Sequence, residues 1–332
     1  MVIRSMNTFA QSTVVVKIPA STANLGPGFD AIGMALSLYE WIEVSIVDQT
    51  EVRLYGDGME GIPTDESNLV YKIVQYVFEQ AGYNEQPVKI SMLSDIPLTR
   101  GLGSSASAIV GALVAANTLI GDHFTKEELF KMATEMEGHP DNVGAALFGG
   151  IVISSWDGQQ APYVKLTPPE ALTTSVAIPH FELSTEKARH ALPEMYSKND
   201  TVFNLGRSAL LVAALAEGKL ELLQLALQDK VHQPYRAALV PGLAHILQHA
   251  HEKSSLGAAL SGAGPTVICF VDKYKHTESE LHAFLAETFA QEQIETTIMT
   301  LQPDLLGTQI IYTATKYDAT FDFIALIEGA HN

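Results

Sequence analysis

Cysteine is almost absent from this sequence of 332 residues, since Cys269 is the only one. A single cysteine excludes an intrachain disulfide and a thiol-rich metal site, so we expect a reducing compartment, the cytoplasm. Long apolar runs are also lacking. The longest, residues 108–121, is too short to cross a bilayer and is broken by Asn117 and Thr118. The opening stretch "MVIRSMNTFAQST" has no continuous apolar segment of the signal-peptide kind. We expect a soluble chain with no membrane partner.

Positive charge is scarce as well. Lysine and arginine number 20 against 38 aspartates and glutamates, which gives a formal net charge of −18. A surface of this sign repels phosphate backbones and anionic lipid, so we expect no nucleic-acid partner. A small anionic ligand remains feasible where helix N-termini, a metal ion or a few arginines reverse the local sign.

The apolar residues that are present, 47% of the chain, suffice for two domains of mixed secondary structure. Runs of strands and helices do not alternate strictly, which favours an α+β fold over a doubly wound sheet. The stretch 156–172, which lacks a clear helix or strand pattern, is the expected boundary between the two domains. Strands are expected at 13–18, 38–47, 87–93, 149–155, 173–179, 256–262 and 265–271, and helices at 68–80, 104–119, 126–137, 199–218, 242–253 and 277–291.

The stretch 97–107, "PLTRGLGSSAS", places two glycines directly before a helix. Without a Cβ at Gly101 and Gly103 the main chain can approach a bulky anion, and the free N–H groups of the helix favour phosphate there. A serine hydroxyl could also reach a metal ion. The stretch is not a Walker A loop, and Gly-x-Gly before a helix is equally typical of tight protein packing.

A second stretch, 135–150, concentrates Glu135, Glu137, His139, Asp141 and Asn142. One carboxylate could bind magnesium while others orient or activate a hydroxyl. The alternative is a solvated helix end capped by Asp141.

Two further stretches are rich in glycine. Residues 19–33 place Asn24 and Asp30 around a bend. Their side chains there either bind a ligand or form hydrogen bonds with neighbouring backbone groups. Residues 261–266, "SGAGPT", join two apolar segments, which in isolation is typical of a plain turn between strands.

Taken in order, these four stretches resemble the conserved blocks of the GHMP kinases, and the match runs from residue 14 to about residue 272. Within that family the likeness is to the homoserine kinases, because "STEKARHALP" (184–193) and "DKVHQPYR" (229–236) also match.

This resemblance implies a two-domain GHMP kinase fold. The N-terminal domain, 1–165, would bind ATP and be ribosomal protein S5 domain 2-like, with a left-handed β-α-β unit. The C-terminal domain, 166–305, would be ferredoxin-like. Residues 306–332 form a tail to which the resemblance assigns no role.

The implied reaction is transfer of the γ-phosphate of ATP to the side-chain hydroxyl of L-homoserine, giving O-phospho-L-homoserine for threonine synthesis. Magnesium would be held by Ser105, in preference to Ser104, and by Glu135, with Glu137 as its nearest competitor. Asn68 would lie beside the adenine. The rest of the implied ATP site comprises Pro97, Arg100, Gly101, Leu102, Gly103, Ser104, Ser105, Ala106 and Ser107.

The same resemblance implies an amino-acid site. Arg189 and Arg236 would clamp the carboxylate, for which a planar, permanently charged fork is suited. The other implied substrate contacts are Asn24, Asp30, His139, Asp141, Thr185 and Gly262.

Asn142, Asp141 and Arg236 would be nearest the reacting groups. Some relatives use an aspartate at the position of Asp141 as a base, but we expect it to bind substrate, in a mechanism that needs no strong base.

Three alternatives remain at this stage. The chain could be a GHMP kinase for mevalonate or shikimate, a non-catalytic sensor of ATP or an amino acid, or an oxidoreductase using residues 101–107 for a dinucleotide. The last lacks a strong signal for an acidic ribose ligand near residues 120–125. The sequence leaves the oligomeric state open and is compatible with a homodimer.

Overall fold

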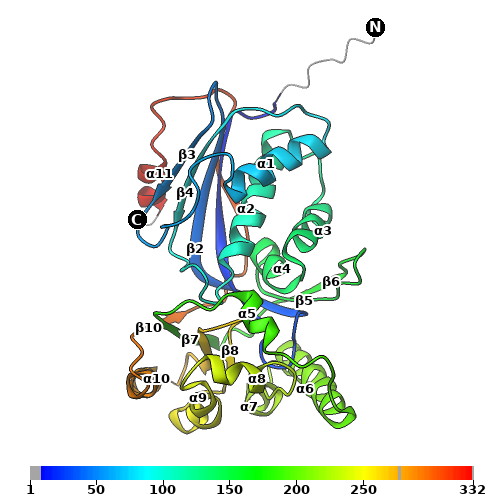
Figure 1. Cartoon of the computed structure of the whole chain (residues 1–332), viewed down its shortest axis with the longest axis vertical. Helices are drawn as coiled ribbons and strands as arrows, with labels where there is room; N and C mark the ends of the chain where they lie inside the picture. The colour runs from blue at the N-terminus through cyan, green and yellow to red at the C-terminus, as the bar shows by residue number, and fades with distance from the viewer. Residues whose placement is uncertain (1–8, 276–277, 331–332) are drawn as a thin grey trace.

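The computed structural model describes residues 9–275 and 278–330 and has two lobes, one above the other in Figure 1. Residues 1–8 of the expected N-terminal domain, and Thr277 at the start of the helix expected at 277–291, lie outside the described ranges. No helix within those ranges is long and apolar enough to cross a membrane.

The N-terminal lobe is built on a seven-stranded sheet of order β11-β1-β2-β4-β3, in which β5 pairs with β2 and with β6. The pair β3–β4 is parallel and is joined by α1, whereas the other pairs are antiparallel. The bounds are β1 Thr13–Ala23, β2 Ile32–Ile46, β3 Glu51–Tyr55, α1 Leu69–Gln80, β4 Val88–Ser94, β5 Ile151–Ser154, β6 Tyr163–Leu166 and β11 Gln309–Ala314.

Helices cover both faces of this sheet. Because side chains alternate along a strand, Ile42 and Val44 of β2 join the core beneath α1–α4, while Trp41 points to the other face. There it meets Phe323 and Ile327 of α11. The two helical layers lie on opposite sides of the sheet in Figure 1. The remaining helices are α2 Ser104–Leu119, α3 Lys126–Glu137, α4 Asp141–Phe148 and α11 Phe323–Ala330.

The C-terminal lobe has a four-stranded antiparallel sheet of order β10-β7-β9-β8, the strand order of a ferredoxin-like domain. Its strands are β7 Leu172–Pro179, β8 Gly257–Leu260, β9 Val267–Asp272 and β10 Thr296–Leu301. Its helices are α5 Thr185–His190, α6 Lys198–Glu217, α7 Leu223–Ala226, α8 Gln233–Arg236, α9 Leu243–His249 and α10 Glu278–Gln291, with 3-10 helices η1 Leu220–Leu222, η2 Ala237–Leu239 and η3 Ala250–Lys253.

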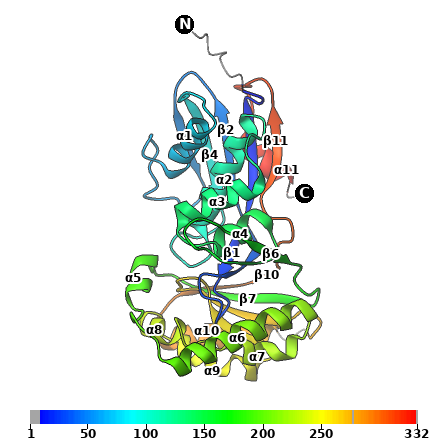
Figure 2. The same ribbon diagram turned by 90° about the vertical axis from the view of Figure 1, so that its right-hand side faces the viewer.

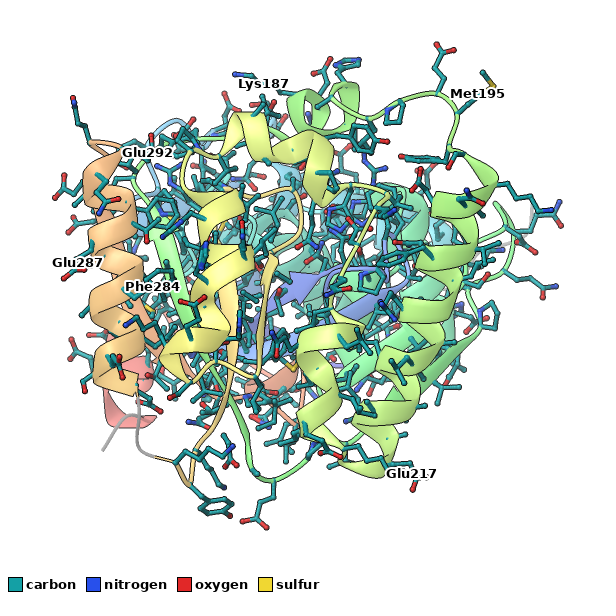
Figure 3. All side chains as sticks on the ribbon, turned by 90° about the horizontal axis from the view of Figure 1, so that it is seen from below. Lys187, Met195, Glu217, Phe284, Glu287 and Glu292 are labelled. Carbon is teal, nitrogen blue, oxygen red and sulfur yellow. The ribbon has the colours of Figure 1, made fainter. Side chains whose placement is uncertain are left out.

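This lobe turns acidic side chains to solvent. Seen from below in Figure 3, Glu217, Glu287 and Glu292 point outward from its periphery, and all three are exposed. They contribute to the negative surface that the composition predicts.

A shared apolar core joins the lobes. Met34 and Leu36 of β2 pack in one cluster with Ile268 and Phe270 of β9. The loop after β1 descends into the lower lobe in Figure 2, where Asn204 of α6 donates a 3.0 Å hydrogen bond to the carbonyl oxygen of Pro27. The loops that the sequence singled out therefore meet where the two lobes touch.

The C-terminal tail returns to the first lobe. In β11, Thr313 pairs with Val14, so the strand extends the N-terminal sheet beyond β1, and α11 covers that sheet's outer face. The expected boundary stretch 156–172 in turn contains β6, which ends the first pass through the N-terminal lobe. The N-terminal lobe is thus made from both ends of the chain.

Candidate functional site

A pocket between the lobes collects most of the residues predicted from the sequence. Its walls come from the loop after β1, the start of α2, the α3–α4 connection, α5, α8 and the loop after β8. The predicted residues that line it are Asn24, Asp30, Gly101, Gly103, Ser104, Ser105, His139, Asp141, Asn142, Thr185, Arg189, Arg236 and Gly262.

Two helix N-termini open on this pocket. The N-cap of α2 is Gly103, in the left-handed conformation with φ 75°, and no described side chain caps the helix. Ser104 and Ser105 in its first turn line the pocket, as do Asp141 and Asn142 at the start of α4. First-turn amides carry the positive end of a helix dipole, so this part of the pocket favours an anion despite the net charge of −18.

Of the two interpretations that the sequence left open for the glycines, the structure favours tight protein packing. A Cβ on Gly101 would lie 2.3 Å from the carbonyl oxygen of Ser261, and one on Gly103 would lie 2.1 Å from Oγ of Ser21. Both residues also have φ above 70°. It is therefore the protein's own chain that requires glycine at these positions, and the anion site is formed by the helix that they introduce.

A hydroxyl and a carboxylate meet at the mouth of α2. Oγ of Ser105 donates a 3.0 Å hydrogen bond to Oε2 of Glu137, and burial raises the pKa of Glu137 although His139, Ser105 and Arg189 oppose the shift. Glu135 lies outside this arrangement, because it is exposed and its Oε1 is 3.7 Å from Nζ of Lys131. The structure thus brings the competitor Glu137 to the pocket, and not Glu135. Residues two apart on a helix point in different directions.

His139 and Asp141 form a buried pair. Nδ1 of His139 shares a 2.5 Å hydrogen bond with Oδ1 of Asp141, which also accepts the backbone N–H of Asn142 at 2.8 Å. Burial lowers the pKa of His139, but the hydrogen bond with Asp141 and the nearby negative charges outweigh it, so that the pKa is raised overall. Among the described residues, ligand atoms of Asp30, His139 and Asp141 lie within 4.8 Å of one another, which is a second place where a cation could bind.

Asn142 is held in one orientation. Its Oδ1 accepts a 2.9 Å hydrogen bond from Oγ of Ser21 in β1. The carbonyl end of the amide is therefore committed to the protein, which leaves the Nδ2 donors for the pocket that Asn142 lines.

Two arginines define the opposite wall. Arg189 of α5 forms a two-pronged ion pair with Asp30 and remains partly exposed. Arg236 is 2% exposed, and it donates from Nε to the carbonyl oxygen of Ala188 and from Nη1 to that of Gly262. Burial lowers the pKa of Arg236 to about 10, and the charge of Arg189 adds to this, so Arg236 stays protonated at neutral pH.

Several predicted ligands lie elsewhere in the part of the chain that the structure describes. Asn68 is the N-cap of α1, since its Oδ1 accepts from the backbone of Val70 at 2.8 Å. Arg100 turns to the carbonyl oxygen of Leu98 at 3.2 Å. The residues outside the pocket lining are Asn68, Pro97, Arg100, Leu102, Ala106, Ser107 and Glu135, of which Leu102, Ala106 and Ser107 are fully buried.

Other residues that line the pocket were not predicted from the sequence. Phe29 carries both arginine side chains over its ring, with Cζ of Arg189 at 5.6 Å and Cζ of Arg236 at 5.3 Å from the ring centroid. Its position between the predicted Asn24 and Asp30 was the available signal. The other unpredicted lining residues are Ala23, Thr99, Leu183, Ala263 and Gly264.

The pocket therefore has two chemically distinct halves. One half offers helix amides and a hydroxyl–carboxylate pair, which suit a phosphate with its cation. The other offers arginines beside a carboxylate, which suit the opposite charges of an amino acid.

Comparison with protein families gives two matches along the chain. Residues 68–150 match the model of the GHMP kinases N terminal domain, and residues 211–291 match that of the GHMP kinases C terminal.

Individual relatives extend over most of the chain. It is 47% identical to a homoserine kinase of Deinococcus radiodurans over 295 residues, 89% of this chain and 96% of the relative. It is 44% identical to a homoserine kinase of Carboxydothermus hydrogenoformans over 89% of this chain and 95% of the relative.

Solved structures agree with these relatives. A crystal structure of homoserine kinase from Cytophaga hutchinsonii superimposes with a TM-score of 0.82 at 28% identity, covering 94% of this chain and 100% of that one. A putative homoserine kinase from Listeria monocytogenes has a TM-score of 0.73 at 30% identity, covering 90% and 99% of the two chains.

Proposed function

The chain belongs to the GHMP kinases and within them to the homoserine kinases, and from that membership we propose how its pocket transfers the γ-phosphate of ATP to the side-chain hydroxyl of L-homoserine. The observation that carries the proposal is the meeting, in one pocket, of the α2 N-terminus with the two arginines and Asp30. The first binds a phosphate chain, and the second recognises a zwitterion.

The triphosphate of ATP lies against the first turn of α2. Ser104 and Ser105 line the pocket at the uncapped start of α2, where the first-turn amides are donors, and Asn142 lines it from α4. Fixed amides of this kind neutralise charge on a phosphoryl group without reorganising as the reaction proceeds. The contact of Asn68 with the adenine stays a prediction; in the structure the side chain of Asn68 caps α1.

Ser105 and Glu137 fit a magnesium ion. Both are oxygen donors, their side-chain atoms are 3.0 Å apart, and the carboxylate of Glu137 is largely withdrawn from water, where a cation stabilises it. When bound, magnesium would neutralise charge on the phosphate oxygens. The cluster of Asp30, His139 and Asp141 is the weaker candidate because Asp30 is already paired with Arg189.

The amino acid occupies the other half of the pocket. Its carboxylate binds Arg189 and Arg236, and its ammonium group binds Asp30. In the structure Arg189 and Asp30 bind each other, through hydrogen bonds of 2.8 and 3.0 Å. The incoming zwitterion therefore exchanges one internal ion pair for two pairs with the ligand, so that no charge is left without a partner.

Further contacts complete the recognition of the amino acid. Asn24, which donates from Nδ2 to the carbonyl oxygen of Gly262 at 2.9 Å, holds the two loops together at the substrate. His139, Asp141 and Thr185 line the same half and supply hydrogen bonds.

Transfer of the phosphoryl group depends on how the hydroxyl of homoserine and the γ-phosphate are positioned. The hydroxyl oxygen of homoserine forms a bond to the γ-phosphorus while the bond from that phosphorus to the bridging oxygen breaks, and ADP leaves with the electron pair. Asn142 orients the hydroxyl, and the hydroxyl proton is lost late, to phosphate or solvent. We assign Asp141 to substrate binding, because positioning and charge neutralisation supply most of what phosphoryl transfer requires. Its Oδ1 is held by His139 and by the backbone amide of Asn142.

The experiment is an assay of ADP release with magnesium-ATP across L-homoserine, L-threonine, L-serine, mevalonate and shikimate, with the phosphorylated product identified by mass. We expect L-homoserine to be preferred and O-phospho-L-homoserine to be the product. Preference for mevalonate or shikimate would assign the pocket to another acceptor, and ATP binding without turnover would indicate a sensor. We place the reaction in the cytoplasm, in keeping with the single buried cysteine.

A further inference from the structure

His232 is a buried histidine directly behind the amino-acid half of the pocket. It immediately precedes α8, it is 0% exposed, and its ring stacks on Phe29 with the centroids 5.3 Å apart. The proposed binding of the amino acid uses Arg236 and Asp30 but gives His232 no part. A fully buried imidazole at this place therefore needs another explanation.

The two ring nitrogens of His232 contact two different walls of the pocket. Nε2 lies 2.7 Å from the carbonyl oxygen of Gly26, in the loop that carries Asp30. Nδ1 lies 3.3 Å from Nη1 of Arg236. One ring thus bridges the segment that binds an ammonium group and the arginine that binds a carboxylate.

These partners allow only one form of the ring. A carbonyl oxygen can only accept, so Nε2 carries the proton, and a guanidinium can only donate, so Nδ1 presents its lone pair. The neutral Nε2–H tautomer satisfies both contacts, whereas a protonated ring would direct an N–H at the N–H of Arg236. Burial, together with the charge of Arg236, lowers the pKa of His232 although Asp229 and Asp30 oppose the shift.

The loop that contains Gly26 also packs against Leu227, which lies in the same lobe as His232. A Cβ on Gly26, whose φ is 74°, would lie 2.2 Å from the carbonyl oxygen of Leu227. Asp229 fixes the start of α8, because its carboxylate accepts the backbone N–H groups of His232 and Gln233 at 2.9 and 2.7 Å. The bridge therefore connects two rigid segments.

Arg236 depends on such a support. Nε and Nη1 are used by backbone carbonyl oxygens and by His232, and among the described residues Nη2 has no such partner, which leaves it for the ligand. Its guanidinium lies over Phe29, the ring on which His232 stacks. The orientation of the fork is therefore set by groups that do not touch the substrate.

We propose that His232 is a positioning residue for the amino-acid substrate: as a neutral Nε2–H imidazole it holds Arg236 and the Asp30 loop at a fixed separation, which matches the carboxylate and ammonium groups of one ligand. This inference rests on the proposed roles of Arg236 and Asp30. It names a residue that acts through them without contacting the substrate.

Two variants separate the two contacts. Glutamine places an amide near Nε2, so His232→Gln keeps the bond to Gly26 and loses the acceptor for Arg236. Asparagine places its oxygen near Nδ1, so His232→Asn keeps the acceptor and loses the bond to the loop. His282→Asn is the matched control, because His282 lies in the same lobe, is partly buried and bonds Ser175 at 3.0 Å.

The measurement is the dissociation constant of L-homoserine and of ATP by calorimetry, with thermal melting as the check on folding. We expect His232→Gln to weaken L-homoserine binding about tenfold, His232→Asn about threefold, and neither to change ATP binding more than about twofold. His282→Asn should change neither constant. Equal loss for both ligands, or a lower melting temperature with unchanged binding, would overturn the proposal.

A double-mutant cycle with Arg236→Lys distinguishes failure of the positioning role of His232 from failure of the carboxylate clamp proposed for Arg236. If His232 acts through Arg236, His232→Gln costs less than about twofold in the lysine background. An undiminished tenfold cost there would refute the link between the residues. If Arg236→Lys by itself leaves L-homoserine binding unchanged, it is the proposed carboxylate clamp that fails. Should His232→Gln not fold, His232→Asn tests the contact with Gly26: because this variant keeps the acceptor for Arg236, its cost should be the same in the lysine background, and a cost that vanishes there would contradict the proposal.

Discussion

Arg189 and Asp30 are bound to each other across the candidate site, Nη1 to Oδ2 at 3.0 Å and Nη2 to Oδ1 at 2.8 Å. The two residues belong to segments of different lobes and lie 159 positions apart in the chain. The pair keeps two opposite charges neutral until a ligand that carries both charges replaces it. This relationship makes the charge of Asp30 the first feature to test.

Asp30→Asn keeps the shape of the side chain and removes its charge. We expect KM for L-homoserine to rise roughly 10- to 100-fold, because one charge-assisted hydrogen bond to the ammonium group is lost, with KM for ATP within about twofold. Steady-state kinetics with each substrate varied in turn measures this. A fall in kcat alone, with KM unchanged, would contradict the role of Asp30 in binding.

Glu137 and Glu135 provide a matched pair two residues apart. Glu137→Gln should raise the magnesium concentration required for half-maximal activity by about tenfold or more, since a carboxylate is replaced by a neutral, weaker ligand. Glu135→Gln should change it by less than about twofold, because Glu135 is exposed and paired with Lys131. A titration of activity with magnesium at saturating ATP measures both. The reverse order would return the metal to Glu135.

Asp141→Asn tests the assignment of the base. If Asp141 binds substrate, KM for L-homoserine rises more than kcat falls, because the loss is mainly in binding. A fall in kcat of about a thousandfold at constant KM would instead identify Asp141 as the general base. The comparison requires kcat and KM from the same preparation, with the melting temperature as the control for folding.

Glu40 links stability to pH. Burial raises the pKa of Glu40 to about 7 from its ordinary value of 4.5, while the hydrogen bond from Ser107 opposes the shift. A carboxyl with a raised pKa contributes stability that is complete below the unfolded pKa and is lost as the pH rises through 7. Relative to wild type, Glu40→Gln should therefore become more stable from pH 5 to 7, by on the order of 3 kcal/mol, and level off above that range.

Urea denaturation of both proteins at pH 5, 6, 7 and 8 measures this difference. Glu60→Gln, the same substitution at an exposed position, is the control. A difference between Glu40→Gln and wild type that does not vary with pH would contradict the prediction.

Gly101→Ala tests the contact between the lobes. The methyl group would lie 2.3 Å from the carbonyl oxygen of Ser261, at a φ of 77°. We expect a loss of about 3 kcal/mol or more in the free energy of unfolding, from backbone strain plus displacement of a rigid neighbour. Gly58→Ala is the control, because Gly58 has a φ of 84° but no described atom lies within 4 Å of the added Cβ, so only the strain of about 1 kcal/mol remains. Equal losses would show that the contact is unimportant.

Much of this architecture could be read from the sequence because its signals are local. The β-branched run at 13–18 and the apolar helix after Gly103 depend only on near neighbours, and both elements are present as β1 and α2. Asn24 and Asp30 of the loop after β1 and Arg189 of α5 were placed by resemblance, and the fold brings them to one pocket.

What could not be read depends on long-range geometry. Whether Glu135 or Glu137 faces the pocket is decided by the rotation of the last turn of α3, which a charge pattern does not specify. The fit of Gly101 against Ser261 joins positions 160 apart, and the pairing of β11 with β1 spans nearly the whole chain. His232 looks like any polar loop residue until the ring is seen between Gly26 and Arg236.

The pairing of β11 with β1 has a consequence for synthesis on the ribosome. Residues 13–17 are translated long before their partners at 309–314. During that interval the growing polypeptide presents an open strand edge to its surroundings, the kind of surface that chaperones shield and that otherwise promotes aggregation. If translation stopped before β11, the product would keep the edge of β1 permanently uncovered.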